Sequence, residues 1–343
     1  MTITKLVAGM LALAIAGIST FSATAEATSV ERANNGAALS TQFIESIKER
    51  TLEVVEYTDG LSSVQSIKNV DALVDAVKQE NPSISDYQLG KSVLIMLGDD
   101  EDFVNSLPTE KVLEALEYTS VERTDVYLRE TQNGELVQIS KSEYDADNAT
   151  AATQATIPSY SETFGKLVLR STAYKRNPTY ALSGRDYYSI RGEVIWEGYP
   201  FFHMTDLMVI SSTGNIDNNY DCTAYGVWGY PEDGFTITDY AHLRSQDGGN
   251  GEYLKLSAPS VYGMGVSMPT DIGDSNFSVE IDHVYAYYGV SSQTDITCQV
   301  SYAHAILAWT PSFSVSSVGT VSFGGIGVQR ETFYGTPFTL YHS

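Results

Sequence analysis

The sequence predicts an α+β protein, with an acidic helical N-terminal region followed by an all-β C-terminal domain of sandwich or jelly-roll type. In the first part of the chain, apolar residues recur at the three- and four-residue spacing of amphipathic helices. The second part contains about ten short apolar segments separated by Gly, Pro, Asn and Asp. Of the 23 tyrosines, 18 lie after residue 150, and tyrosine favours strands. The change near residue 150 therefore divides the chain into two parts.

Residues 1–25 have the composition of a secretory signal peptide. Lys5 precedes an apolar run over residues 6–18, and a small-residue motif ends at Ala25. We expect cleavage between Ala25 and Glu26, which predicts a secreted, extracellular protein. A membrane anchor is the alternative, although the run is shorter than the roughly 20 residues that a spanning helix needs.

Residues 26–144 are expected to form the acidic, mainly helical region. One helix should begin after Asn69, as its N-cap, and end before Pro82, because the residue preceding a proline avoids the helical conformation. Ser85 and Gln88 have the spacing of a capping box at the start of the next helix.

A β-hairpin and a linker are expected to follow these helices. Apolar and polar residues alternate on both sides of Asn133-Gly134, a preferred hairpin turn. Residues 145–160 are rich in Ala and Thr and lack apolar periodicity, so they are expected to form a linker. The linker leads into the predicted β-sandwich domain of residues 161–343.

The β domain is defined by a series of short segments with strand character. They are bounded by turn-forming residues, and none has helical periodicity. The expected strands are Lys166–Ala173, Gly192–Trp196, Phe201–Ile210, Ala224–Trp228, Phe235–Leu243, Tyr253–Leu256, Ser278–Tyr287, Ile296–Leu307, Ser312–Val318 and Phe333–Leu340.

The chain has two cysteines, Cys222 and Cys298. In an oxidising compartment such a pair most simply forms one disulfide bond. The bond would close a loop of about 77 residues and would stabilise the fold by reducing the entropy of the unfolded chain. Two buried free thiols are the alternative.

The chain is strongly acidic, with 43 acidic and 20 basic residues and a formal net charge of −23. A nucleic-acid backbone would be repelled by such a surface, so nucleic acid is not expected as a partner. The same repulsion disfavours attraction to an anionic lipid surface.

The sequence lacks the motifs of common enzyme classes, and no catalytic residue is predicted. It has no G-x-S-x-G elbow, no phosphate-binding loop and no dinucleotide fingerprint, and its five histidines have no metal-ligand spacing. A glycoside hydrolase needs two facing carboxylates. Glu193, Glu197, Glu252 and Glu280 could supply such a pair, so an extracellular hydrolase stays an alternative.

No cofactor is expected, with calcium as the alternative. Asp217, Asn219 and Asp221 offer oxygen ligands at every second position, as calcium loops do. The segment lacks the glycine and the distal glutamate of the helix-loop-helix calcium site, because Cys222 stands where the glycine would be. A turn without metal is the other interpretation.

Aromatic residues suggest a ligand-binding surface on the β domain. Trp196, Tyr199, Trp228 and Tyr230 are the candidate contacts, because Tyr and Trp combine a rigid apolar face with a polar edge. The alternative is that these aromatic residues only fit strands.

One further segment has an amphipathic pattern. In Ser312 to Val328, apolar residues alternate with serines. A membrane-inserting hairpin would face lipid with the apolar residues and a lumen with the serines. A half-buried hairpin within a sandwich fits the pattern equally.

Residues 103–111 and 113–118, with the sequences FVNSLPTEK and LEALEY, and the later FFHMTD at 201–206 resemble parts of uncharacterised secreted proteins of Gram-positive bacteria. These proteins have a helical N-terminal part and a β-rich C-terminal part. The resemblance implies a secreted two-part architecture and implies no activity.

These observations predict a secreted non-catalytic binding protein that acts at or outside the bacterial cell surface through its aromatic-rich β domain. The expected partner is a surface ligand, either a glycan or a protein. One alternative is a protoxin or large bacteriocin whose β domain acts on membranes after cleavage within 145–160 removes the acidic N-terminal half. The second alternative is an extracellular hydrolase.

Overall fold

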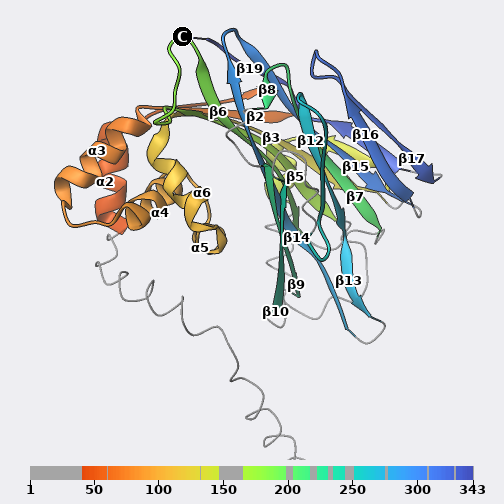
Figure 1. The fold of residues 1–343 in the computed structure, drawn as a ribbon. Coiled ribbons are helices and arrows are strands. Elements are labelled where there is room, and N and C mark those ends of the chain that lie inside the picture. Colours follow the sequence, from red (N-terminus) through yellow and green to blue (C-terminus); the bar gives the residue numbers. More distant parts are fainter. Residues whose placement is uncertain are drawn as a thin grey trace, which may run out of the picture.

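The computed structural model describes residues 41–59, 61–131, 133–146, 165–197, 204–216, 222–230, 235–243, 251–274, 277–306, 309–327 and 330–342. These residues form four layers (Figure 1). Short helices cover one face of a long antiparallel sheet, and a second sheet packs on its other face. A two-stranded hairpin covers the outer face of the second sheet.

The long sheet has 11 strands among the described residues. Eight of them follow one another in space, in the order β1, β2, β3, β5, β6, β14, β9 and β10, whereas β4 pairs with β3, and β8 and β13 pair with β14. Their bounds are β1 Glu53–Asp59, β2 Ser62–Lys68, β3 Tyr118–Glu130, β4 Leu136–Ile139, β5 Lys166–Arg176, β6 Asp186–Glu197, β8 Asn215–Ile216, β9 Cys222–Tyr230, β10 Phe235–Leu243, β13 Asp271–Asp274 and β14 Phe277–Ser292.

The second sheet has the order β11, β12, β7, β15 and β18, with β19 also paired to β15. The covering hairpin consists of β16 and β17, which pair with each other. The bounds are β7 Thr205–Ser212, β11 Lys255–Ser260, β12 Gly263–Pro269, β15 Ile296–Ala305, β16 Trp309–Val315, β17 Val321–Gly327, β18 Arg330–Tyr334 and β19 Phe338–Leu340.

The helical layer consists of α2 Thr41–Thr51, α3 Val70–Glu80, α4 Asp86–Met96, α5 Glu101–Ser106, α6 Thr109–Glu114 and the 3₁₀ turn η2 Ala115–Glu117. The capping box at the start of α4 is confirmed, because Ser85 and Gln88 bond each other's backbone N–H groups. Helix α3 also begins as expected. However, Asn69 has a φ of 64° and makes no side-chain cap, so its predicted capping role is wrong.

Two apolar cores lie on opposite faces of the long sheet. Side chains alternate between the faces of a strand. On β3, Val121 therefore packs with the helices, whereas Val126 and Leu128 pack between the two sheets. The long sheet is covered on both faces, which explains why much of β6 and β14 is buried on both faces.

The predicted fold class is wrong. The described residues are mostly β, with 56% strand and 21% helix, rather than a helical region followed by a separate β domain. Strands β1 to β4 belong to residues 26–144, yet they extend the same sheet that β5 and β6 build. Two adjacent valines in β1 interrupt the alternation of apolar and polar residues that is typical of a strand. The β1–β2 hairpin was therefore not predicted from the sequence.

The expected disulfide bond is also wrong, because Cys222 and Cys298 are both buried and form no disulfide bond in the described part of the chain. Cys222 begins β9 in the long sheet and Cys298 lies on β15 in the second sheet, and both belong to the core between the sheets. They serve there as small apolar side chains. Burial raises the pKa of the Cys298 thiol to about 12, so this thiol stays protonated and unreactive at neutral pH.

Some predictions fall outside the described residues. These are the signal peptide, its cleavage site between Ala25 and Glu26, and residues 147–160 of the linker. Asp145 and Ala146, the first two linker residues, belong to a helical segment at 141–146. In the described part of the chain, no helix combines the length and apolar character needed to cross a membrane.

Candidate ligand-binding site

The two tryptophans of the predicted aromatic site lie in the core. Trp196 is 2% exposed and donates its Nε1–H to the Tyr302 hydroxyl at 3.3 Å. Trp228 is fully buried and donates its Nε1–H to the Pro269 carbonyl at 2.9 Å. Tyr199 and the side chain of Tyr230 lie outside the described residues. The structure therefore does not place the two tryptophan rings on a common surface.

The predicted calcium ligands Asp217, Asn219 and Asp221 also lie outside the described residues. Within the part of the chain that is described, no three His, Cys, Asp or Glu side chains come together in a way that could hold a metal ion. Calcium binding by that loop stays a prediction.

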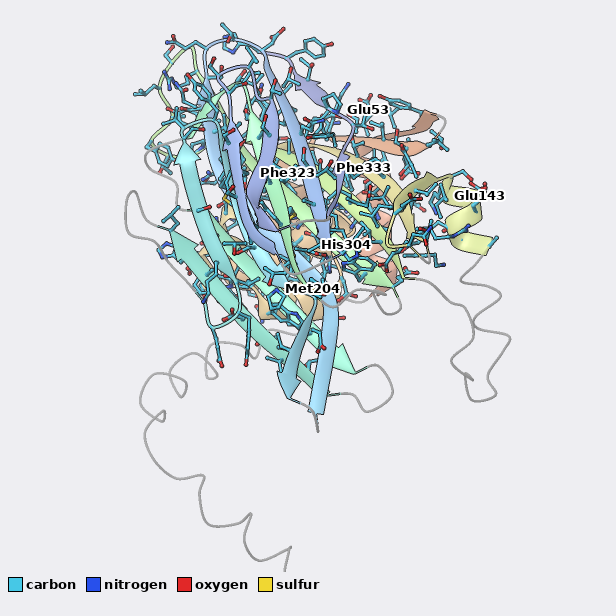
Figure 2. The ribbon with its side chains drawn as sticks, turned by 90° about the vertical axis from the view of Figure 1, so that its right-hand side faces the viewer. Glu53, Glu143, Met204, His304, Phe323 and Phe333 are labelled. Atoms are coloured by element: carbon cyan, nitrogen blue, oxygen red, sulfur yellow. The ribbon has the colours of Figure 1, made fainter. Side chains whose placement is uncertain are left out.

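An open groove of about 420 Å³ lies at the β1 end of the long sheet. We call it the β1–β3 groove. It is lined by residues of β1, β2 and β3 and by Lys141 of the helical segment 141–146. Figure 2 labels Glu53 on β1 and Glu143 in this helical segment. Its wall includes Glu56, Thr58, Ser63, Gln65, Arg123 and Asp125.

Strand register places these six side chains in two rows on one face of the sheet. Glu56 lies opposite Gln65, which lies opposite Arg123. Thr58 lies opposite Ser63, which in turn lies opposite Asp125. Directly opposed residues on neighbouring antiparallel strands are close enough to interact. Each row therefore presents a continuous series of hydrogen-bonding groups across three strands.

The outer part of the groove contains hydroxyl, amide and ammonium groups. Gln65 Nε2 donates to Glu56 Oε1, and the Ser63 and Tyr127 hydroxyls are 3.0 Å apart. Lys141 closes one side, where its Nζ bonds Asp145 at 2.7 Å and lies 5.9 Å from the centre of the Tyr127 ring.

Two buried polar atoms of groove residues have no hydrogen-bond partner among the residues that the structure describes. They are Gln65 Oε1 and Arg123 Nε, which belong to residues directly opposite each other on β2 and β3. An unsatisfied buried polar atom costs about 1–3 kcal/mol. One atom is an acceptor and the other is a donor.

A buried network of charges lies beside the groove, on the same face of the sheet. Arg191 donates to both oxygens of Asp99, at 2.6 and 3.0 Å, and Arg123 donates to Asp99 at 3.3 Å. Arg170 forms two bonds with Asp125, at 2.7 and 2.9 Å. Such paired bonds fix the planes of both partners. The network therefore holds Arg123 and Asp125 in place.

Glu193 completes the network. Its carboxylate contacts Arg191, lies 3.6 Å from Arg170 and lies 3.2 Å from Nε2 of His283. Burial alone would raise the pKa of Glu193, but the two guanidinium groups outweigh it and lower this pKa. Three arginines then balance the three carboxylates of Asp99, Asp125 and Glu193. The buried group is neutral as a whole.

His283 does not act as a charged member of this network. Burial lowers its pKa to about 4, so the imidazole is neutral at pH 7. Its ring packs against Tyr285, with ring centres 3.5 Å apart, and near Phe103. Of the carboxylates considered for a hydrolase, Glu193 is 1% exposed and bound by two arginines. This arrangement suits positioning and binding rather than proton transfer.

A second buried polar cluster joins the two sheets. His304 on β15 lies 2.9 Å from Asp206 on β7 and 3.0 Å from Glu130 on β3, and all three residues are fully buried. Figure 2 labels His304. Burial alone would lower the pKa of His304, but the two carboxylates outweigh it and raise this pKa to about 10. The cluster is a charged connection between the two sheets, and its three residues are not among those that line the β1–β3 groove.

Another groove, of about 440 Å³, lies on the outer side of the second sheet near the β16–β17 turn. Its lining is uncharged and includes Ser211, Gln299 and Tyr334. Gln299 Nε2 donates to the Gly335 carbonyl at 2.6 Å, and the Ser211 hydroxyl donates to the Gln299 carbonyl at 3.4 Å. These groups already have partners, so the β1–β3 groove is the stronger candidate.

Sequence reasoning did not find the groove. It depends on β1 and β2, which were not predicted, and on register between strands far apart in the chain. One signal was present, because Asp59-Gly60 between two strand-like segments is a favoured hairpin turn.

A comparison of the chain with protein-family models and with curated protein sequences finds no match. The function must therefore be argued from the geometry of the site.

Proposed function

We propose that this chain is a secreted, non-catalytic binding protein that acts at or outside the bacterial cell surface, and that the β1–β3 groove is its ligand site. One observation supports this proposal above the others. The groove is open, and two opposed residues of its wall have a polar atom without a partner among the described residues, the acceptor Gln65 Oε1 and the donor Arg123 Nε. The buried network beside the groove holds this geometry before a ligand arrives, which reduces the entropy lost on binding.

The chemistry of the groove favours a ligand rich in hydroxyl or amide groups, such as a glycan. A hydroxyl group can donate to Gln65 and accept from Arg123 at the same time. Thr58 and Ser63 add hydroxyls beside them.

The proposal is tested with the full chain from Glu26, measured for binding to isolated bacterial cell envelopes and to a panel of immobilised glycans. Thr58→Arg fills the groove with a large charged side chain on an exposed position. We expect it to weaken binding by about tenfold or more, which corresponds to about 1.4 kcal/mol.

Thr236→Arg is the matched control, because Thr236 is an exposed threonine on β10, at the other end of the same sheet. It makes the same change of charge and should leave binding unchanged. The proposal fails if the wild-type chain binds neither envelopes nor glycans, or if Thr58→Arg binds as well as Thr236→Arg.

The protoxin is the second candidate, and the β16–β17 hairpin favours it. Among the described strands this hairpin pairs only with itself, and Phe313 and Val315 pack against the second sheet. Two observations weigh against it. Each strand has 7 residues, whereas a membrane-crossing strand needs about 9–11. In addition, β3 of the supposed pro-segment pairs with β5 along its whole length. Release of dye from liposomes by the cleaved chain, and not by the intact chain, would favour the protoxin.

A further inference from the structure

We propose that β1 is a docking edge for an extended, basic peptide segment of a partner protein, which adds to the long sheet as one more strand. This inference rests on the proposed function, because the added strand would border the β1–β3 groove. The binding mode is strand addition, in which main-chain hydrogen bonds give affinity and alternate side chains give specificity.

The first observation is that β1 ends the long sheet without proline, lysine or a bulge. Among the described strands, β1 pairs only with β2. Its seven residues contain no proline and no lysine, and its pairing with β2 is continuous from Glu53 to Asp59, without a bulge. Proline, charged residues and bulges are devices that block edge-to-edge pairing, and the charges that β1 carries are all acidic, so they oppose an acidic strand and not a basic one.

The opposite end of the sheet provides a contrast. There the Asp239 carboxylate of β10 accepts hydrogen bonds from the backbone N–H groups of residues 252, 253 and 254. That segment leads into β11 and contacts β10. The β10 end is therefore partly covered by the chain itself.

The second observation is a group of exposed apolar side chains at β1. Val54 is 43% exposed, Val55 is 46% exposed and Tyr57 is 57% exposed. Val54 and Val55 are adjacent, so they lie on opposite faces of the strand. Leu61 in the β1–β2 turn is 44% exposed, and its carbonyl accepts a hydrogen bond from Gln138 of β4. A neighbouring strand could contact apolar side chains on both faces of the edge.

The third observation is the acidic charge of β1, which distinguishes between the strands that could pair with this edge. Full-length antiparallel pairing of β1 with a second copy would place Glu56 opposite Glu56, and like charges directly opposite each other are unfavourable. It would also bring together two chains with a formal charge of −23 each. A basic strand instead meets Glu53 and Glu56, which lie three positions apart on opposite faces. The expected partner segment therefore has two basic residues three positions apart, with apolar residues between them.

The probe is a fluorescent nine-residue peptide of valine and threonine with two lysines three positions apart, titrated into the full chain from Glu26. One control peptide has glutamates in place of the lysines, and another has a central proline. We expect the lysine peptide to bind about tenfold or more tightly than either control, with affinity that falls as salt is added.

Val55→Lys tests the edge directly, because lysine on an edge strand opposes pairing with a further strand. The new charge lies on the face of β1 opposite to the face that carries Glu56. We expect it to weaken binding of the lysine peptide about tenfold or more. Val261→Lys is the matched control, since Val261 is 51% exposed in the turn between β11 and β12, and should bind like wild type. Circular dichroism and thermal unfolding of both variants check that the fold is retained.

Three outcomes would overturn the inference. These are equal binding of the lysine and glutamate peptides, unchanged binding by Val55→Lys, and a dimer in solution that Val55→Lys dissociates. Its failure can be distinguished from failure of the proposed function. If Thr58→Arg loses envelope binding while Val55→Lys retains it and no peptide binds, only the strand-addition inference is wrong. If the peptide binds but envelopes and glycans do not, only the groove proposal is wrong.

Discussion

Asp99 is the residue that connects the helical layer to the long sheet. It lies just after α4 and accepts hydrogen bonds from Arg191 on β6 and Arg123 on β3. Arg191 is 1% exposed, and its guanidinium group lies 5.3 Å from the centre of the Phe103 ring. Removal of the carboxylate would leave two buried guanidinium groups with too little negative charge.

Asp99→Asn should therefore destabilise the protein by about 3–5 kcal/mol, the usual cost of breaking a buried ion pair from one side. Urea unfolding of the full chain measures the change. Asp75→Asn is the control, because Asp75 is exposed on α3, and it should change stability by less than about 0.5 kcal/mol. Equal stability of the two variants would show that the Asp99 carboxylate does not compensate the positive charges of Arg191 and Arg123.

His304 should make stability depend on pH in the alkaline range. Its pKa rises from an ordinary value near 6.5 to about 10 in the folded chain. A raised pKa means that the folded state binds the proton more tightly. The stabilisation is therefore complete below about pH 6.5 and is lost as pH rises through 10. It is on the order of 3–5 kcal/mol.

NMR titration of the histidine rings measures this directly. The His304 ring should stay protonated up to about pH 10, whereas the buried His283 ring should stay neutral down to about pH 4. A His304 ring that loses its proton near pH 6.5 would contradict the buried ion cluster. Sequence alone could not reveal this cluster, because His304 lies 98 residues from Asp206 and 174 residues from Glu130.

At the scale of elements, α4 shows what sequence can predict well. The capping box of Ser85 and Gln88 is local, so its spacing alone indicates the start of the helix. Strand β10 also has the predicted bounds, Phe235–Leu243. By contrast, β1 and β2 were missed, because the apolar residues of β1 are exposed and those of neither strand alternate with polar residues. The groove that depends on them was therefore not predictable.

Ser85→Ala should destabilise the protein by about 1 kcal/mol, because it leaves a backbone N–H group at the start of α4 without its side-chain acceptor. Ser83→Ala is the matched control, since Ser83 is exposed and its hydroxyl donates to the Asn81 side chain rather than capping the helix. Thermal unfolding should separate the two variants. Equal melting temperatures would mean that the cap does not stabilise the helix.

The molecule as a whole behaves as one structure rather than as two independent halves. Strand β3 pairs with β5 from Tyr118 to Arg129, and Val126 and Leu128 enter the core between the sheets. The division predicted near residue 150 reflects a true change in composition. Composition, however, does not show which distant strands pair. In the same way, export to an oxidising compartment does not show whether two cysteines lie close enough in the fold to form a disulfide bond.

A chain with a protease site inserted within residues 147–160 should keep both fragments together after cleavage. The cut leaves the pairing of β3 with β5 and the core contacts intact. Size-exclusion chromatography of cut and uncut chains should give the same elution volume, with separation only in denaturant. Two separate folded fragments would contradict the shared sheet and would support a removable N-terminal half.

Site-specific photo-crosslinking to bacterial cell envelopes tests whether ligands bind at the β1–β3 groove. A photoreactive amino acid replaces Lys141, which lines the groove, in one chain and Tyr341, which is 74% exposed, in another. Crosslinking should occur from position 141 and not from position 341. Excess unlabelled wild-type chain should suppress it, whereas excess Thr58→Arg should not. Crosslinking from position 341 alone, or equal suppression by both competitors, would contradict ligand binding at the groove.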